Sequence, residues 1–114
     1  MSTFSLIYST FANKEDAEKA ATHLLQKRLI GCAVFLPAHS MYWWKGAIES
    51  SPEVLLLAKT TRAKSVKARA ELAKIHPYET PCILEWAAEP NASYLNWLMG
   101  EVRETKKPTQ KKKK

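Results

Sequence analysis

The sequence predicts an α+β domain built on one antiparallel sheet. Residues 4–10 alternate apolar and polar side chains like a strand, a long hairpin centres on Lys45-Gly46, and two helical patterns flank that hairpin. The resulting order is β-α-β-β-α-β, the ferredoxin-like split βαβ arrangement, and residues 91–102 add a C-terminal helix. We expect two helices on one face of the sheet, an uncovered second face, and the second and fourth strands at the edges.

The first helix is expected to begin after Asn13 and to end near Arg28. Asn13 can cap its first turn, and Glu15 and Asp16 place negative charge where the helix dipole favours it. Its apolar residues recur with helical spacing and form one stripe: Ala17, Ala20, Ala21, Leu24 and Leu25.

The hairpin is expected to run from Cys32 to Lys59. We expect a bend or bulge at Pro37 and an irregularity near Ser51-Pro52. Adjacent residues on a strand point to opposite faces, so Trp43 and Trp44 cannot both face one core. At least one aromatic must find a partner elsewhere, which favours self-association; a platform on which nucleic-acid bases stack is the alternative.

The second helix is expected from Arg62 to about Ile75, and Pro77 ends it. Its apolar side carries Val66, Ala70 and Ala73. A fourth strand at residues 82–87 follows, and then a final helix capped by Asn91 or Ser93. The apolar residues of that helix are Leu95, Leu98 and Val102.

The segment from His76 to Pro81 concentrates polar chemistry between two prolines. Pro77 and Pro81 restrict the residues before them and lack backbone donors, so the segment should be extended and stiff. This composition suits a binding site, and it equally suits a plain connection from a helix to a strand.

The charge of +7 lies mostly at the C-terminal end. Residues 103–114 carry seven basic residues against Glu104 alone, a net charge of +6, which leaves about +1 to residues 1–102. We expect one folded domain over residues 1–102 and a basic, disordered tail over residues 103–114. A nearly neutral body disfavours specific nucleic-acid binding.

The sequence shows neither a membrane-length apolar run nor a secretory signal, so we expect a cytoplasmic protein that does not contact the membrane. Cys32 and Cys82 have no metal-ligand spacing and should lie about 14 Å apart across the sheet. We expect two buried free thiols rather than a disulfide within one chain.

Several motifs follow one another in a fixed order: Leu29-Ile30-Gly31-Cys32-Ala33, Tyr42-Trp43-Trp44-Lys45-Gly46 with Glu49, the strand Val54–Lys59, His76-Pro77-Tyr78-Glu79-Thr80-Pro81, and Tyr94-Leu95-Asn96-Trp97-Leu98. Over about residues 4–98 the chain resembles the CutA divalent-cation tolerance family. The resemblance implies a compact homotrimer similar to PII signalling proteins, with a cavity at each subunit interface. It also implies a role in tolerance of copper and other divalent cations, with no enzymatic reaction.

The resemblance also implies roles for individual residues. Tyr42, Trp43 and Trp97 belong to the hairpin and C-terminal helix that would make the interface, and the ligand cavity would gather Cys32, Trp44, Lys59 and Tyr78. At the positions of the family's proposed copper ligands this chain has Ser9, Ile75 and His76, so only one ligand remains. His76 with Glu79 is left as a candidate for weak binding of copper or another divalent cation, completed by a neighbouring subunit.

Two alternatives remain open at the level of sequence. The cavity residues could simply pair with one another, for example Lys59 with Glu79 as an ion pair between subunits. The protein could also be a PII-like sensor or adaptor for a small ligand, or, with less support, a nucleic-acid-binding module.

Overall fold

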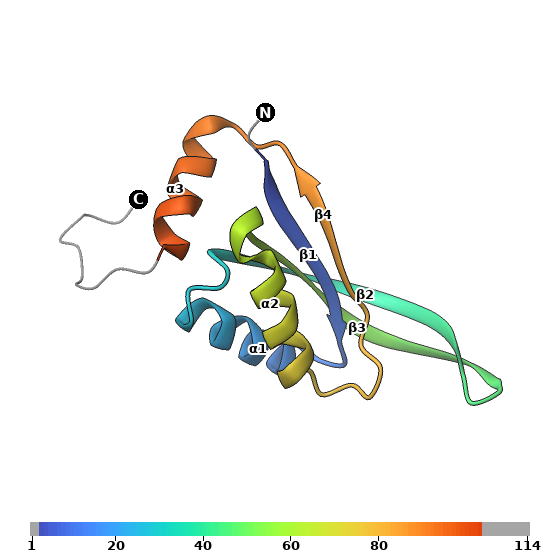
Figure 1. Ribbon diagram of the computed structural model, residues 1–114. Coiled ribbons are helices and arrows are strands. Elements are labelled where there is room, and N and C mark those ends of the chain that lie inside the picture. The colour runs from blue at the N-terminus through green and yellow to red at the C-terminus, as the bar shows by residue number, and fades with distance from the viewer. Residues whose placement is uncertain (1–2, 104–114) are drawn as a thin grey trace.

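The computed structural model describes residues 3–103, which form a four-stranded antiparallel sheet with three helices (Figure 1). The elements are β1 (Phe4–Phe11), α1 (Lys14–Gln26), β2 (Cys32–Trp44), β3 (Ala47–Thr61), α2 (Arg62–Ile75), β4 (Ile83–Ala88) and α3 (Ala92–Val102). The strand order is β2-β3-β1-β4, so the predicted fold and both predicted edge strands are confirmed. Of the expected tail, everything after Arg103 lies outside the described residues.

One face of the sheet and two helices enclose the main core. Alternate residues of β1 point to this face, and Ile7 and Phe11 are completely or almost completely buried there. Leu56 and Ala58 of β3 continue the same face, and α1 closes it with the predicted stripe, of which Ala17, Ala20, Ala21 and Leu24 are buried. Asn13 caps α1 as expected, because its side-chain oxygen accepts a hydrogen bond from the Asp16 N–H at 2.7 Å.

The face that α2 turns toward the sheet differs from the prediction. Val66 is 65% exposed, and Ala70 and Ala73 are exposed as well. The buried residues are instead Ser65, Ala68 and Leu72. This stripe includes the large Leu72 side chain, and the Ser65 hydroxyl is satisfied by donating to the Arg62 carbonyl at 3.0 Å. Burying Leu72 removes more apolar area from water than burying an alanine would, which decides the rotation of the helix.

The hairpin is regular throughout, so the predicted irregularities at Pro37 and near Ser51-Pro52 were wrong. The pairing of β2 with β3 continues without a shift from Cys32 opposite Lys59 to Trp44 opposite Ala47. Pro37 lies on the edge strand, and Pro52 lies beyond the last residue of β3 that pairs with β1, so neither proline interrupts a central ladder. Lys45 and Gly46 both have positive φ, as a two-residue type I′ turn requires.

The second face of the sheet, called the open face below, is covered only at one end. There α3 packs Leu95, Leu98 and Val102 against Phe4. Farther along, the register aligns Leu84, Tyr8, Leu57 and Val34 in one row across all four strands. Leu84 and Val34 are 48% and 36% exposed, and neighbouring Trp86 and Leu36 are similarly open.

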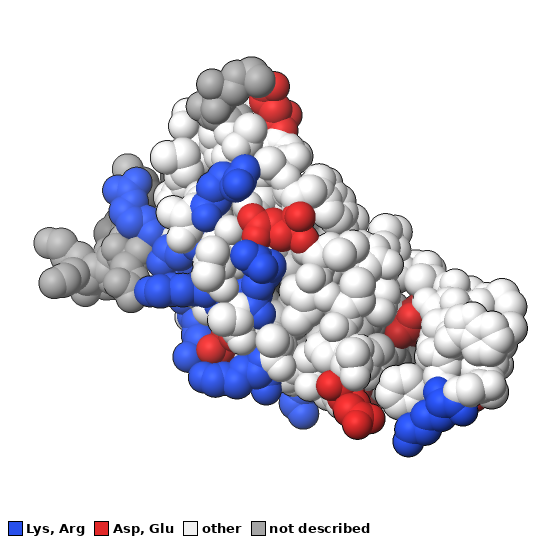
Figure 2. All heavy atoms as spheres, turned by 45° about the vertical axis from the view of Figure 1, so that its right-hand side comes forward, with Lys and Arg blue, Asp and Glu red and all other residues white. Residues whose placement is uncertain are grey.

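Figure 2 shows lysines and arginines gathered on one side of the body and a broad uncharged surface that extends toward the hairpin. Among residues 3–103, no helix is long and apolar enough to cross a membrane. Both cysteines are free thiols, as expected, but only Cys32 is partly buried. Cys82 is exposed, because it lies in the connection just before β4 rather than within the strand where burial was predicted.

Candidate functional site

His76 is held at the end of α2 by contacts to both ring nitrogens. Nδ1 accepts a hydrogen bond from the Tyr78 N–H at 3.1 Å, so the ring proton of the neutral imidazole lies on Nε2. Nε2 lies 3.0 Å from the Thr10 carbonyl oxygen and 3.2 Å from the Ser9 hydroxyl oxygen. The ring stacks on Phe11 with centroids 4.2 Å apart and is 8% exposed. Burial lowers the pKa of His76, so the neutral form is favoured.

Tyr78 connects this segment to the hairpin through a carboxylate. Its hydroxyl donates to Glu53 Oε2 at 2.5 Å, and the Ser40 hydroxyl donates to Glu53 Oε1. Burial, followed by the hydrogen bond to Glu53, raises the pKa of Tyr78. The pairing of β3 with β1 ends at Val54. Glu53 is the next residue toward the hairpin turn and has no partner on β1. Tyr78 therefore fixes the base of the projecting hairpin.

A second group of predicted residues lies beneath α3 on the open face. Cys32 and Lys59 are register partners on β2 and β3, and the Lys59 ammonium lies 5.1 Å from the centroid of the Tyr94 ring. The Tyr94 ring also packs against Trp97, with centroids 5.4 Å apart. Burial, with the neighbouring Cys32 thiol as a further cause, raises the pKa of Tyr94 to about 12. This end of the sheet is thus a packed mixture of aromatic, thiol and ammonium groups.

The remaining predicted residues lie at the tip of the hairpin. Trp43 is 72% exposed, and Tyr42 and Trp44 are also exposed. Lys45 lies 5.7 Å from the centroid of the Trp44 ring. Trp44 is twelve residues along β2 from Cys32, about 40 Å at the rise of an extended strand. The residues predicted to share a cavity therefore lie in three separate places within one chain.

Known proteins are similar to this chain in both sequence and architecture. The family model for the CutA1 divalent ion tolerance protein matches residues 5–101. A divalent-cation tolerance protein CutA from Thermotoga maritima is 44% identical over 98 residues, which is 85% of this chain and 97% of that protein. The corresponding protein from Pyrococcus horikoshii is 37% identical over 99 residues, 86% of this chain and 97% of its own.

The chain belongs to the CutA1 family. A crystal structure of CutA1 from Ehrlichia chaffeensis superposes with a TM-score of 0.87 at 30% identity, covering 91% of this chain and 99% of that one. The structure of a periplasmic divalent cation tolerance protein CutA from Archaeoglobus fulgidus superposes with a TM-score of 0.83 at 35% identity, covering 88% of this chain and 99% of that one. The resemblance predicted from the motifs is therefore confirmed.

The donor set of one CutA1-family chain does not fit a resident divalent cation. Within residues 3–103, His, Cys, Asp and Glu side chains form no group of three or more that could hold a metal ion. Both nitrogens of His76 are already engaged, and Glu79 is exposed and makes no ion pair with another described residue. Binding at His76 and Glu79 would require the imidazole to release the Tyr78 N–H and would need further ligands from outside this chain.

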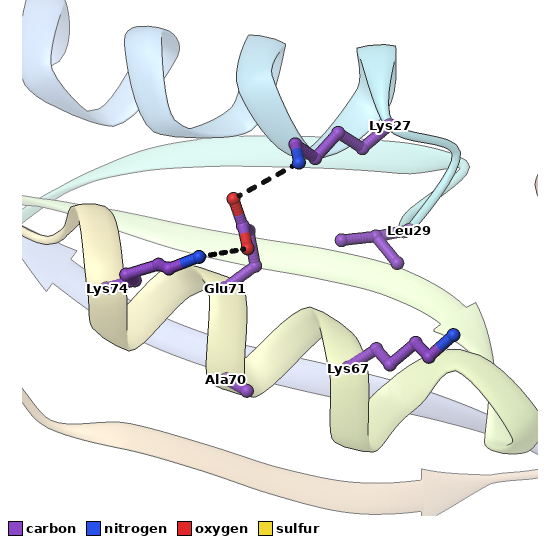
Figure 3. Close-up of a pocket in the computed structure, with 6 residues that line it drawn as sticks. All are labelled: Lys27, Leu29, Lys67, Ala70, Glu71 and Lys74. Atoms are coloured by element: carbon purple, nitrogen blue, oxygen red, sulfur yellow. Dashed lines mark ion pairs between the residues drawn. The ribbon is translucent and has the colours of Figure 1, made fainter.

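Sequence reasoning missed two parts of the arrangement. Glu53 accepts hydrogen bonds from both Tyr78 and Ser40. No local sequence pattern marks Glu53 for this role, because the role depends on where β1 ends relative to β3. A groove between α1 and α2 was also missed (Figure 3). A sequence signal for it exists, since Lys67, Glu71 and Lys74 recur at i, i+4 and i+7 on one face of α2.

Proposed function

We propose that this protein acts in divalent-cation tolerance as a non-enzymatic homotrimer whose ligand sites form between subunits. The observation that carries the proposal is the apolar open face of the sheet in a member of the CutA1 family. Uncovered apolar patches of this kind mark interaction surfaces. A second copy of the same chain is the occupant that the family's motifs imply.

The separation of the predicted cavity residues supports assembly. Trp44 lies about 40 Å from Cys32 along β2, so the two side chains cannot line one small-molecule site in a single chain. A projecting hairpin can reach a neighbouring subunit, where Trp44 would meet Lys59 or Tyr78 of another copy. Tyr42, Trp43 and Trp97 are proposed as contacts in that interface. A divalent cation such as copper would bind weakly there, with Glu79 and His76 as partial ligands.

The Ser9–His76 pair supports a role without catalysis. Its 3.2 Å separation is close to that of a nucleophile and its general base. However, the N–H of Tyr78 occupies Nδ1, so Nε2 carries a proton and cannot accept one from Ser9. The Ser9 side chain is completely buried and donates to the Cys82 carbonyl at 2.8 Å. These contacts make the pair a structural one.

The nucleic-acid alternative has less support. A base-stacking platform needs cations beside its aromatic residues. In the described strands, Lys59 is the one basic residue that the register places on the open face beside its aromatic side chains: it pairs with Leu6, which pairs with Trp86 on its other side. By contrast, α2 carries five basic residues: Arg62, Lys64, Lys67, Arg69 and Lys74. We propose a cytoplasmic location, although the relative from Archaeoglobus fulgidus is called periplasmic and one from rice chloroplastic.

Charging the open face tests the proposal. Val34→Glu should place a carboxylate in the proposed interface, whereas Val66→Glu makes the same change at an exposed position on α2. Light scattering should give about three times the 12.9 kDa chain mass for the original protein and for Val66→Glu, and a lower mass for Val34→Glu. A monomeric original protein would refute the trimer.

The functional half of the test uses bacteria whose own CutA1-family gene has been deleted. The original chain and Val66→Glu should restore growth in raised copper or zinc, and Val34→Glu at equal abundance should not. Full rescue by a monomeric Val34→Glu protein would show that tolerance does not depend on assembly. Absence of rescue by the original chain would refute the role in cation tolerance itself.

A further inference from the structure

A groove of about 490 Å³ lies between the end of α1 and the outer side of α2, away from the open face (Figure 3). It is lined by Lys27, Leu29, Lys67, Ala70, Glu71 and Lys74. The small side chain of Ala70 leaves room between Lys67 and Lys74, which lie one turn of α2 on either side of it. Its volume is within the range of small-molecule sites.

The charges in the groove do not balance. Glu71 is the only carboxylate of the lining, and three cations or potential cations already contact it: His23 at 2.6 Å, Lys27 at 3.6 Å and Lys74 at 3.6 Å. Three lysines against one carboxylate leave a charge of +2.

Lys67 is the lysine without such a contact. It forms no ion pair with any residue in the described range 3–103, and in Figure 3 its ammonium points away from Glu71. An anion in the groove would therefore meet one unpaired cation and two cations that share a single carboxylate.

We propose that this groove binds a small organic phosphate. Lysine ammonium groups bind phosphate as point charges, and a phosphate monoester carries nearly two negative charges at pH 8. Leu29 and Ala70 provide an apolar surface for the carbon part of the ligand. The groove stays accessible when the open face is covered, because the two surfaces lie on opposite sides of the sheet.

Calorimetric titration of the full chain with glycerol 3-phosphate at pH 8 and low, chloride-matched ionic strength tests this assignment. We expect saturable binding with one site per chain, no heat of binding from glycerol, and weaker binding of inorganic phosphate. Lys67→Ala should weaken binding roughly tenfold, because it removes one charge close to a dianion in water. Lys45→Ala removes the same charge at the distant hairpin turn and should leave the affinity unchanged.

A second pair of variants distinguishes binding in the groove from general electrostatic attraction to α2. Ala70→Glu places a carboxylate inside the groove and should abolish binding, whereas Ala73→Glu places it at an exposed position of α2 that does not line the groove. Equal losses from these two variants, or no saturable binding by the original protein, would overturn the proposal. Equal affinity for inorganic phosphate would overturn the choice of an organic ligand.

Discussion

Gly31 is the position where a single methyl group should loosen α3. A Cβ at residue 31 would lie 2.5 Å from Leu98 Cδ1, a distance that real Cβ contacts do not reach. Leu98 is completely buried and belongs to the small core between α3 and the open face. The end of the Leu98 side chain must shift, and because Leu98 is completely buried it can do so only by repacking against its neighbours. Gly31→Ala should therefore lower the free energy of unfolding by about 1–3 kcal/mol, the usual cost of overpacking.

Gly100 supplies a matched control for the same substitution. It lies within α3, and a Cβ there would meet nothing within 4 Å. Gly100→Ala should therefore raise the free energy of unfolding by about 0.5–1 kcal/mol, because alanine is the better helix former. The same substitution is thus expected to destabilise the protein at Gly31, which faces Leu98 of α3, and to stabilise it at Gly100, on the exposed side of α3.

Equilibrium unfolding in guanidinium chloride, followed by tryptophan fluorescence, measures both effects. Trp97 is on α3 and reports the same element. The protein concentration must be held constant, because assembly contributes to the apparent stability. A neutral or stabilising Gly31→Ala, or a Gly100→Ala as destabilising as Gly31→Ala, would refute the close packing of α3 at this position.

Two further predictions concern the segment after α2. Tyr78→Phe removes the donor to Glu53 and should cost about 1–2 kcal/mol of unfolding free energy, measured in the same assay. Burial lowers the folded-state pKa of His76 below its ordinary value of about 6.5. The contribution of His76 to stability should therefore be constant above that pH and should fall as pH decreases toward the lowered pKa. His76→Gln should reduce the loss of unfolding free energy at acid pH, whereas the same substitution at exposed His39 should not. An unchanged pH dependence in His76→Gln would contradict the role of His76 in this loss.

Much of the fold could be predicted from the sequence because local signals agreed with the overall arrangement. The alternation in β1, the cap at Asn13 and the Lys45-Gly46 turn each specify a local conformation, and together they leave one topology. The rotation of α2 could not be read this way. Its sequence offers two short apolar stripes, and the choice between Val66 and Leu72 depends on how each side chain fits the sheet.

The site was less predictable, because its parts are joined by long-range geometry. The motif around His76 predicted an extended, stiff segment with a phenol and an imidazole; His76 itself is extended, but residues 77–80 form consecutive bends. The motif could not show that Tyr78 provides the N–H that occupies the imidazole, or that Glu53 receives the phenol. Proximity between Lys59 and Tyr94 likewise depends on where α3 returns to the sheet. In the proposed assembly the cavity would be shared by several chains, and no pattern within one sequence specifies how those chains meet.

The regular pairing of β2 with β3 has a consequence for how order is distributed along the hairpin. Beyond Val54 the two strands have no third strand beside them, and a two-stranded ribbon is marginally stable in water. The Tyr78–Glu53 contact anchors one end, while the turn at Lys45-Gly46 lies at the other. Amide hydrogens should therefore exchange progressively faster toward the turn in dilute protein and become protected as concentration rises, so that folding of the ribbon and association of subunits are one coupled event.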